Sequence, residues 1–191
     1  VRWRRFKDPF QRFFYPGFSV EMTGDPQAYK ETLLRLFPAE RPGIERYFKL
    51  TRQALGWERS LLIMRSVAPP WFRRLARWAL AKRVDSMYRS TRAFVSGLSQ
   101  SLELQGILDA QWGTYGIPPS RSPMLWNAMI FWHYADGAYY PLGGAGEIAK
   151  AVTRFVKAGG GDVLLQREVL EVLIEDGAAR GVRARVRNRR A

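Results

Sequence analysis

The sequence predicts a mixed α+β or α/β fold, in which a mostly helical region with an N-terminal hairpin precedes a smaller unit of helix and strands. Between residues 26 and 134 the predicted segments are nearly all helices, separated by proline and glycine. From residue 139 a glycine loop, an amphipathic helix, a strand and a hairpin follow in immediate succession. The 191 residues, 47% of them hydrophobic, are enough to bury a core.

The helical region divides at recognisable breaks. Residues 1–24 alternate aromatic and polar side chains, which predicts a hairpin that turns at Tyr15-Pro16-Gly17. Helices are expected after Asp25-Pro26 and on both sides of Pro69-Pro70, and their predicted bounds are 26–37, 40–65 with an interruption near Gly56, and 71–83. A longer helical stretch over 85–110, a loop over 113–123 and a final apolar helix over 124–134 complete this region.

A glycine loop begins the second unit. Gly143 and Gly144 remove two side chains where the backbone must approach something closely, and the next helix directs its partially positive end at the same place. Ile148, Val152 and Phe155 are spaced to form one buried stripe of that helix.

The remaining segments of this unit are predicted as strands. Residues 163–166 suit a short strand, and residues 169–176 with Gly177 suit a hairpin. An ordinary structural unit of one helix and two strands would have the same pattern, so the pattern alone does not establish a ligand site.

Several segments resemble one enzyme family. YYPLGGAGEIAKAV at 139–152 is similar to the tyrosine-proline-x-glycine-glycine signature of the phytoene desaturase, carotenoid isomerase and retinol saturase family, and 161–183 resembles its next strand and hairpin. Upstream, DPF, YKETLLRLFPAE, ERYFKL, TYGIPPSRSP and HYADGAYYP are similar, in order, to the retinol saturase branch. The order and spacing of these short motifs carry the resemblance, which covers most of the chain.

The resemblance implies an FAD-dependent oxidoreductase that saturates, desaturates or isomerises C=C bonds of a carotenoid- or retinoid-like polyene. Residues 1–137 would be the substrate domain, and residues 138–191 the returning part of a Rossmann-like FAD domain. The GxGxxG turn that holds a dinucleotide pyrophosphate is absent from the 191 residues. We therefore expect an interior fragment of a two-domain flavoprotein that is inactive alone.

The same resemblance implies site residues. The expected cofactor-binding residues are Tyr140, Pro141, Gly143, Gly144 and Val169. The expected tunnel for the polyene is lined by Trp126, Ala128, Phe131, Tyr134, Ala138 and Tyr139. His133 is a weak catalytic candidate, because a histidine in this position is also compatible with a hydrogen-bonded core residue.

The predicted helix at 71–83 suggests a second function. Trp71 and Trp78 share one face with Phe72 beside them, and Arg73, Arg74 and Arg77 cluster on the other, as in a helix that lies in a membrane interface. A domain helix with solvated arginines is the alternative. With 31 Lys and Arg against 17 Asp and Glu, the net charge of +14 suits anionic lipid. We expect peripheral association with the cytoplasmic face of a membrane.

A non-enzymatic basic module that binds anionic membrane or nucleic acid is the rival hypothesis. Nucleic acid is not expected, since no zinc finger, RRM signature or KH loop is present. There is no Cys and a single His, which excludes zinc clusters, thiol nucleophiles and disulfides, so no metal is expected. The arginine-rich segment after Ala184 suits either a basic tail or a truncated end.

Overall fold

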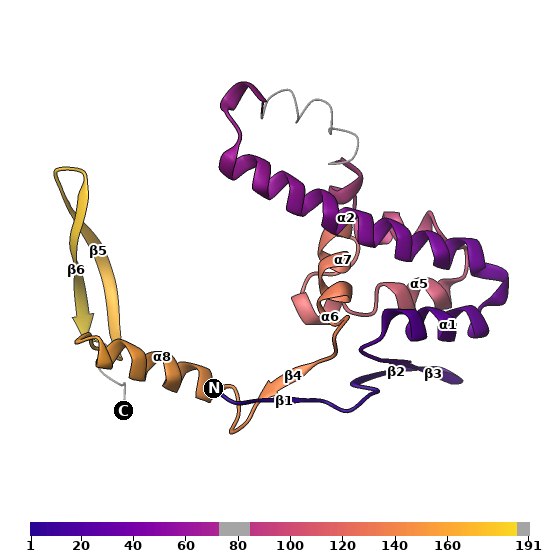
Figure 1. The fold of residues 1–191 in the computed structure, drawn as a ribbon, viewed down its shortest axis with the longest axis horizontal. Coiled ribbons are helices and arrows are strands. Elements are labelled where there is room, and N and C mark those ends of the chain that lie inside the picture. Colours follow the sequence, from indigo (N-terminus) through magenta and orange to yellow (C-terminus); the bar gives the residue numbers. More distant parts are fainter. Residues whose placement is uncertain (73–84, 187–191) are drawn as a thin grey trace. The chain divides into compact units, whose positions relative to one another are not determined.

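The computed structural model describes residues 1–72 and 85–186 (Figure 1). The chain divides into two compact units, one formed by Arg5–Tyr139 and the other by Val1–Arg4 with Tyr140–Ala191. Helices and small two-stranded sheets occur together, which agrees with the predicted α+β class. None of the helices in the described ranges is both long and apolar enough to cross a bilayer.

The chain passes between the two units along paired strands. β1 (Trp3–Arg5) pairs with β4 (Tyr139–Pro141). Phe6 N donates to Ala138 O at 2.9 Å, and Leu142 N donates to Arg2 O at 2.8 Å. The prediction that the first residues belong to the N-terminal hairpin was therefore wrong, because their backbone hydrogen bonds are made with a segment far along the sequence.

The predicted hairpin is confirmed for the residues that follow. β2 (Gln11–Tyr15) pairs antiparallel with β3 (Phe18–Met22), and Gly17 turns the chain with a φ of +83°. Such a φ is accessible to glycine at little cost. Val20 and Met22 alternate with exposed residues, so one side of β3 enters the core.

The first helices begin where the sequence predicts. In α1 (Pro26–Leu36), the Asp25 side chain caps the helix by accepting a hydrogen bond from Gln27 N at 2.8 Å. A short turn, η1 (Pro38–Glu40), leads into α2 (Arg41–Val67). This helix continues through Gly56, so the expected interruption was wrong: an interior glycine costs about 1 kcal/mol relative to alanine, which is too little to end a long helix.

The single helical stretch expected over 85–110 was also wrong. It contains α4 (Thr91–Ser96) and α5 (Leu102–Leu108). The Ser90 and Ser101 side chains each accept a hydrogen bond from a first-turn backbone N–H, which starts a new helix at each serine. α6 (Trp112–Tyr115) follows, and α7 (Met124–His133) confirms the predicted apolar helix.

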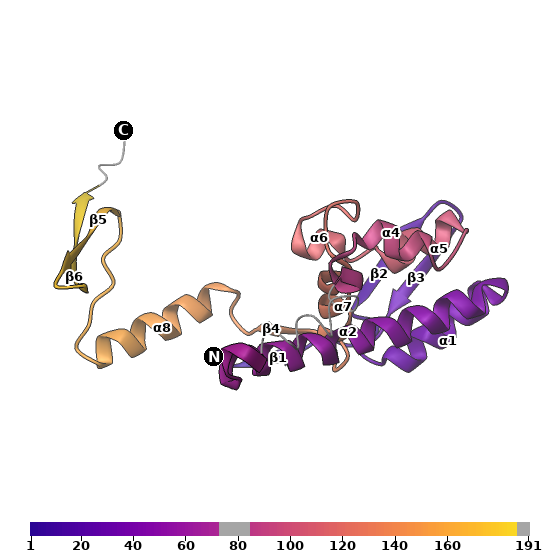
Figure 2. The same ribbon diagram turned by 90° about the horizontal axis from the view of Figure 1, so that it is seen from above.

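The core of the larger unit lies where α7 packs on the first half of α2, and both Figure 1 and Figure 2 show the two helices side by side. Tyr47, Phe48 and Phe131 form a cluster of edge-to-face rings there. The Tyr47 hydroxyl donates to Asn127 Oδ1 at 2.7 Å, and Asn127 Nδ2 donates to Leu108 O at 3.2 Å. The buried polar groups of this network therefore have partners.

The smaller unit contains α8 (Gly146–Ala158), β5 (Arg167–Glu175) and β6 (Ala178–Val186). The predicted hairpin is confirmed, with its turn at Asp176-Gly177, where φ is +50° and +74°. The predicted strand at 163–166 was wrong. These residues form no strand, because a strand needs a neighbour and the described part of the chain pairs none with them.

The apolar stripe of α8 is not buried. Ile148 and Val152 are exposed, and Phe155 is 81% exposed. No residue of this helix is buried, so the expected burial was wrong for the described chain. The stripe itself has the predicted spacing; what is missing among the described residues is a surface that covers it.

Candidate functional site

The predicted cofactor loop lies between β4 and α8. After Pro141, which is buried, Gly144 N donates to Pro141 O at 3.1 Å and closes a turn. Both Gly143 and Gly144 have a φ of +93°. Such angles are strained for any residue with a Cβ, so the turn requires its glycines.

The space around the two glycines differs. A Cβ placed on Gly143 would lie 3.0 Å from Cγ of Glu147, whereas a Cβ on Gly144 would meet no atom within 4 Å. The backbone at Gly144 is therefore open to the approach of a ligand at the start of a 13-residue helix. Contact of this backbone with a cofactor stays a prediction.

Glu147 occupies the first turn of α8. Its carboxylate accepts a hydrogen bond from Lys150 Nζ at 2.7 Å, and this bond, with the charge of Lys150, lowers the pKa of Glu147 below its usual value. A carboxylate in the first helical turn is favourable next to the helix dipole. Glu147 thus stabilises the helix start and limits the space beside Gly143.

Val169, the other predicted cofactor contact, lies on β5 opposite Ala184. Its side chain is exposed. The two arginines of β6 on either side of Ala184 have partners across the hairpin: Arg185 lies 2.8 Å from Glu168, and Arg183 lies 3.4 Å from Glu171. The charged face of β6 is therefore matched by glutamates at the register positions of β5.

The predicted tunnel residues lie at different depths of the larger unit. Ala128 and Phe131 are buried in the core against α2, Tyr134 and Ala138 are partly buried, and Trp126 and Tyr139 are exposed. Tyr134 stacks on Phe10 with ring centroids 5.1 Å apart. The predicted tunnel residues that remain accessible to a ligand are consequently Trp126, near the start of α7, and Tyr134, Ala138 and Tyr139, which lie between the end of α7 and the start of β4.

His133 is the last residue of α7. It is exposed, and its ring lies edge-on to Tyr134 at 5.5 Å. The alternative of a buried core histidine does not apply in the described structure. A catalytic role for this residue stays a prediction.

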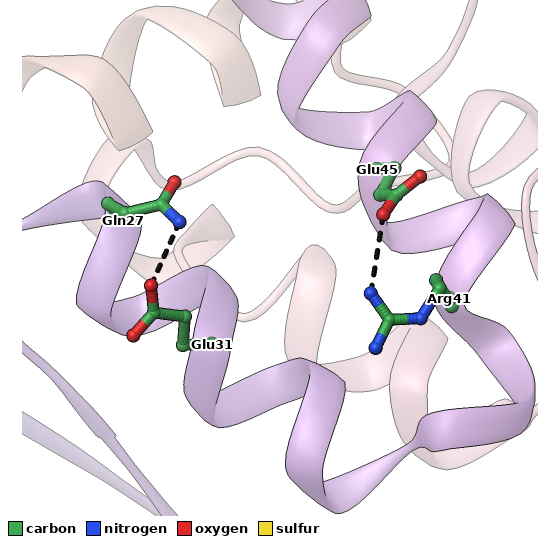
Figure 3. A network of polar contacts seen from close by, with 4 residues as sticks. All are labelled: Gln27, Glu31, Arg41 and Glu45. Atoms are coloured by element: carbon green, nitrogen blue, oxygen red, sulfur yellow. Dashed lines mark hydrogen bonds and ion pairs between the residues drawn. The ribbon is translucent and has the colours of Figure 1, made fainter.

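A groove that the sequence did not indicate lies along α1 and the start of α2. It has a volume of about 700 Å³ and is lined by Ala28, Glu31, Thr32, Leu34, Arg35 and Arg41. Figure 3 shows two of its charged side chains, Glu31 and Arg41, each with a partner on its own helix: Gln27 Nε2 donates to Glu31 Oε1 at 2.9 Å, and Arg41 lies 3.5 Å from Glu45 Oε1. Exposed pairs of this spacing contribute only tenths of a kcal/mol, so they stabilise helices rather than mark a ligand.

Asp109, at the end of α5, has the most perturbed carboxyl among the described residues. Its partial burial raises the pKa from 3.8 to about 6, and the charge of Arg92 acts in the opposite direction. The pKa of Tyr15 is raised to about 12, chiefly by burial of its hydroxyl and to a smaller extent by the charge of Asp109. No sequence pattern identified this carboxyl, because its desolvation arises only in the folded chain.

The predicted membrane-contact residues are only partly within the described chain. Trp71 and Phe72 are exposed, with their rings edge-on at 5.8 Å. Arg73, Arg74, Arg77 and Trp78 lie outside the described residues. The interpretation of that segment as an interfacial helix stays a prediction.

Comparison with known proteins identifies relatives. No family model matches the chain. It is 32% identical over 179 residues to all-trans-retinol 13,14-reductase of Homo sapiens, covering 91% of this chain and 28% of that protein. The Danio rerio protein of the same name is 31% identical over 152 residues, covering 78% of this chain and 25% of that protein. Phytoene desaturase (neurosporene-forming) of Cereibacter sphaeroides is 24% identical over 181 residues, covering 92% and 34%.

The chain thus spans about a quarter to a third of the length of these relatives. The 179-residue match is longer than either compact unit, so it includes parts of both. A reductase of retinol and a desaturase of phytoene both align with nearly the whole chain, as the motifs in the sequence predict. These relationships place the chain in the retinol saturase and phytoene desaturase family.

Proposed function

We propose that these residues form part of an FAD-dependent oxidoreductase that acts on C=C bonds of a retinoid- or carotenoid-like polyene. The observation that carries the proposal is the 32% identity, over 91% of the chain, to a retinol reductase. The match to a phytoene desaturase supports a polyene as the substrate class. The proposal includes saturation, desaturation and isomerisation, which use the same arrangement of a long apolar substrate beside a redox cofactor.

The loop geometry supports a place for the cofactor. Gly144 has open space beside its backbone, and Tyr140, Pro141 and Gly143 adjoin it in the sequence. FAD, when bound, would supply the redox chemistry. The role of the loop would be to let backbone approach the cofactor, and Val169 would contribute its backbone rather than its side chain. The 191 residues contain no GxGxxG, so we propose that the pyrophosphate is held by other residues of a larger protein.

Apolar contact would hold the substrate. A polyene offers no charge, so its affinity must come from apolar area removed from water, at roughly 25 cal/mol per Å². Tyr134, Ala138, Tyr139 and Trp126 are accessible enough to contribute. Ala128 and Phe131, which are buried, would not contact the substrate themselves but would hold α7 in place against α2. We also propose that the protein associates peripherally with the cytoplasmic face of a membrane, because polyene lipids dissolve in the bilayer.

The test uses the complete protein. Its purified form should show a flavin absorption spectrum. Anaerobic incubation with all-trans-retinol and dithionite, which reduces the flavin, or with phytoene and a quinone as electron acceptor, should yield a product with an altered number or geometry of C=C bonds, detected by chromatography. Ala138→Trp should leave the flavin spectrum unchanged and reduce turnover of a long polyene more than that of a shortened analogue. A flavin-free protein without polyene turnover would contradict the proposal.

The non-enzymatic alternative, a basic module for membrane or nucleic acid, rests on the net charge of +14. The relatives favour the enzyme, because the aligned proteins are a reductase and a desaturase. The same preparation separates the two hypotheses. A protein that lacks flavin and binds anionic vesicles or nucleic acid would support the basic module.

A further inference from the structure

Three segments that are far apart in the sequence meet at one point of the larger unit. They contribute Arg5 at the end of β1, Gly24 before α1, and Gly137 between α7 and β4. Gly24 and Gly137 are buried, and Gly137 has a φ of +90°. A Cβ added to Gly24 would lie 2.8 Å from both Cα and N of Gly137. No side chain therefore fits between the two backbones, and glycine is required where they cross.

The guanidinium of Arg5 packs against the same crossing. A Cβ added to Gly137 would lie 2.8 Å from Arg5 Nε and 3.1 Å from Nη2, and a Cβ added to Gly24 would lie 3.2 Å from Nη2. Gly24 is also fixed from its N–H, which donates to Asp8 Oδ1 at 2.9 Å. Because the guanidinium is planar and rigid, it fills this narrow space in a way that an ammonium on a flexible stem does not.

Further contacts fix the connection between α7 and β4, residues 134–138, which is called the α7–β4 connection below. At one end, Phe6 N donates to Ala138 O at 2.9 Å. At the other end, the ring of Phe10 stacks on Tyr134 with centroids 5.1 Å apart. The N-terminal segment of the larger unit therefore contacts the connection at both of its ends, in addition to the glycine crossing in between.

The α7–β4 connection carries residues proposed for the substrate. Tyr134 and Ala138 belong to it, and Tyr139 follows directly. The side chain of Ala138 is a single methyl group without rotamers, so its position is set by its backbone, which Gly137 precedes. Misplacement of contact groups by about 1 Å, even by a change far from the chemistry, lowers a rate by about 100-fold. The packing that fixes Gly137 therefore bears on how the substrate is held.

We propose that Arg5 is a positioning residue for the polyene substrate. Its guanidinium holds Gly137 in the left-handed conformation, and Gly137 in turn sets where Ala138 and Tyr139 meet the polyene. Arg5 touches neither the polyene nor the cofactor and acts through the α7–β4 connection alone. The inference rests on the proposed function, because Arg5 positions substrate contacts only if the polyene is the substrate. No sequence motif assigned a role to Arg5, since the three segments meet only in the folded chain.

The substrate preference of the complete protein tests the proposal. The polyene that the unchanged protein converts, all-trans-retinol or phytoene, is compared with an analogue of it that has a shortened chain. The ratio of the two kcat/KM values on one preparation does not depend on the fraction of folded protein, so a loss of stability alone leaves it unchanged. Arg5→Met should lower the preference for the long chain about tenfold, because the loosened connection misplaces the substrate that extends furthest along it.

Two other variants complete the measurement. Arg5→Lys keeps the charge but loses the planar group, so it should shift the preference in the same direction. Arg4→Met is the matched control, because Arg4 is the preceding residue of β1 and adjacent side chains of a strand point to opposite faces. It should leave the preference unchanged. The flavin spectrum should be the same in all three variants.

Amide hydrogen exchange tests the crossing without any substrate. Phe6 N donates to Ala138 O, and Gly137 N donates to Tyr134 O at 2.9 Å, so both N–H groups report on the α7–β4 connection. In Arg5→Met they should exchange faster than in the unchanged protein and in the Arg4 control, because local opening becomes easier.

The outcomes distinguish this proposal from the proposed function. An unchanged preference in both Arg5 variants, an equal shift in the Arg4 control, or unchanged hydrogen exchange would each overturn the positioning role. If Arg5→Met does not fold, Arg5→Lys gives the deciding ratio. Failure of the proposed function is seen already in the unchanged protein, as missing flavin and missing polyene turnover, and it would remove the substrate that Arg5 is proposed to position.

Discussion

Replacement of Gly144 by valine gives the sharpest test of the glycine loop, because the structure supplies a matched control. Gly144 has a φ of +93° and Gly160 a φ of +80°, and at both positions an added Cβ would meet no atom within 4 Å. Gly144 precedes α8 and Gly160 follows it. Each valine should therefore introduce a similar backbone strain, about 1–2 kcal/mol. A difference in flavin affinity between the two variants would then have a cause other than backbone strain.

The expected difference lies in flavin affinity. If a cofactor occupies the open space at Gly144, a valine there collides with it, and overpacking of this kind costs about 1–3 kcal/mol. That range corresponds to about 5- to 150-fold weaker binding. Gly143 is the poorer probe, because its Cβ would also approach Glu147 at 3.0 Å.

The assay compares the complete protein with Gly144→Val and Gly160→Val. Flavin dissociation is measured by fluorescence during equilibrium dialysis, and thermal denaturation of the flavin-free forms reports the strain. We expect equal loss of stability in both variants and a loss of flavin affinity in Gly144→Val alone. Equal flavin affinity in the two variants would refute the reasoning and leave the loop as a structural turn.

Three further predictions concern the larger unit and are measured by denaturant unfolding. Gly43→Ala should destabilise it by about 3 kcal/mol or more, since the added Cβ would lie 2.3 Å from Leu98 O, whereas Gly56→Ala, with open space, should stabilise it by about 0.5–1 kcal/mol. Tyr47→Phe should cost about 1–3 kcal/mol because Asn127 Oδ1 loses its buried donor, and an unchanged unfolding midpoint would contradict this network. Asp109→Asn should increase the free energy of unfolding well above pH 6, and this gain should disappear below pH 3.8. The reason is that the folded carboxyl, with its raised pKa, binds a proton more tightly than the unfolded one, so that the stability of the unchanged protein falls as the pH rises between these values. An equal gain at both pH values would exclude titration of Asp109 as the cause.

Elements with local signals were predictable. The Asp25 cap and Pro26 indicate the start of α1. Pro16-Gly17 indicates the turn between β2 and β3, and Gly177 indicates the turn between β5 and β6. In each case the deciding contact lies within a few residues of the signal. The left-handed φ at Gly143 and Gly144 belongs to the same class, since a glycine pair after a proline indicates a tight turn.

Elements that depend on distant partners were not predictable. β1 pairs with β4, across more than a hundred residues, and residues 163–166 form no strand because the described chain offers them no neighbour. The raised pKa of Asp109 likewise follows from its partial burial, which is a property of the folded chain. The pairings Arg183–Glu171 and Arg185–Glu168 required the strand register, which the sequence does not state.

The sequence by itself determined which helix faces are apolar, where local caps and turns lie, and which family the motifs resemble. Only the tertiary structure decided which of those faces are covered. The first half of α2 is buried against α7 while its second half is exposed, and the equally regular stripe of α8 is exposed throughout. The physical reason is that periodicity is a property of one segment, whereas burial requires a second surface at the right distance.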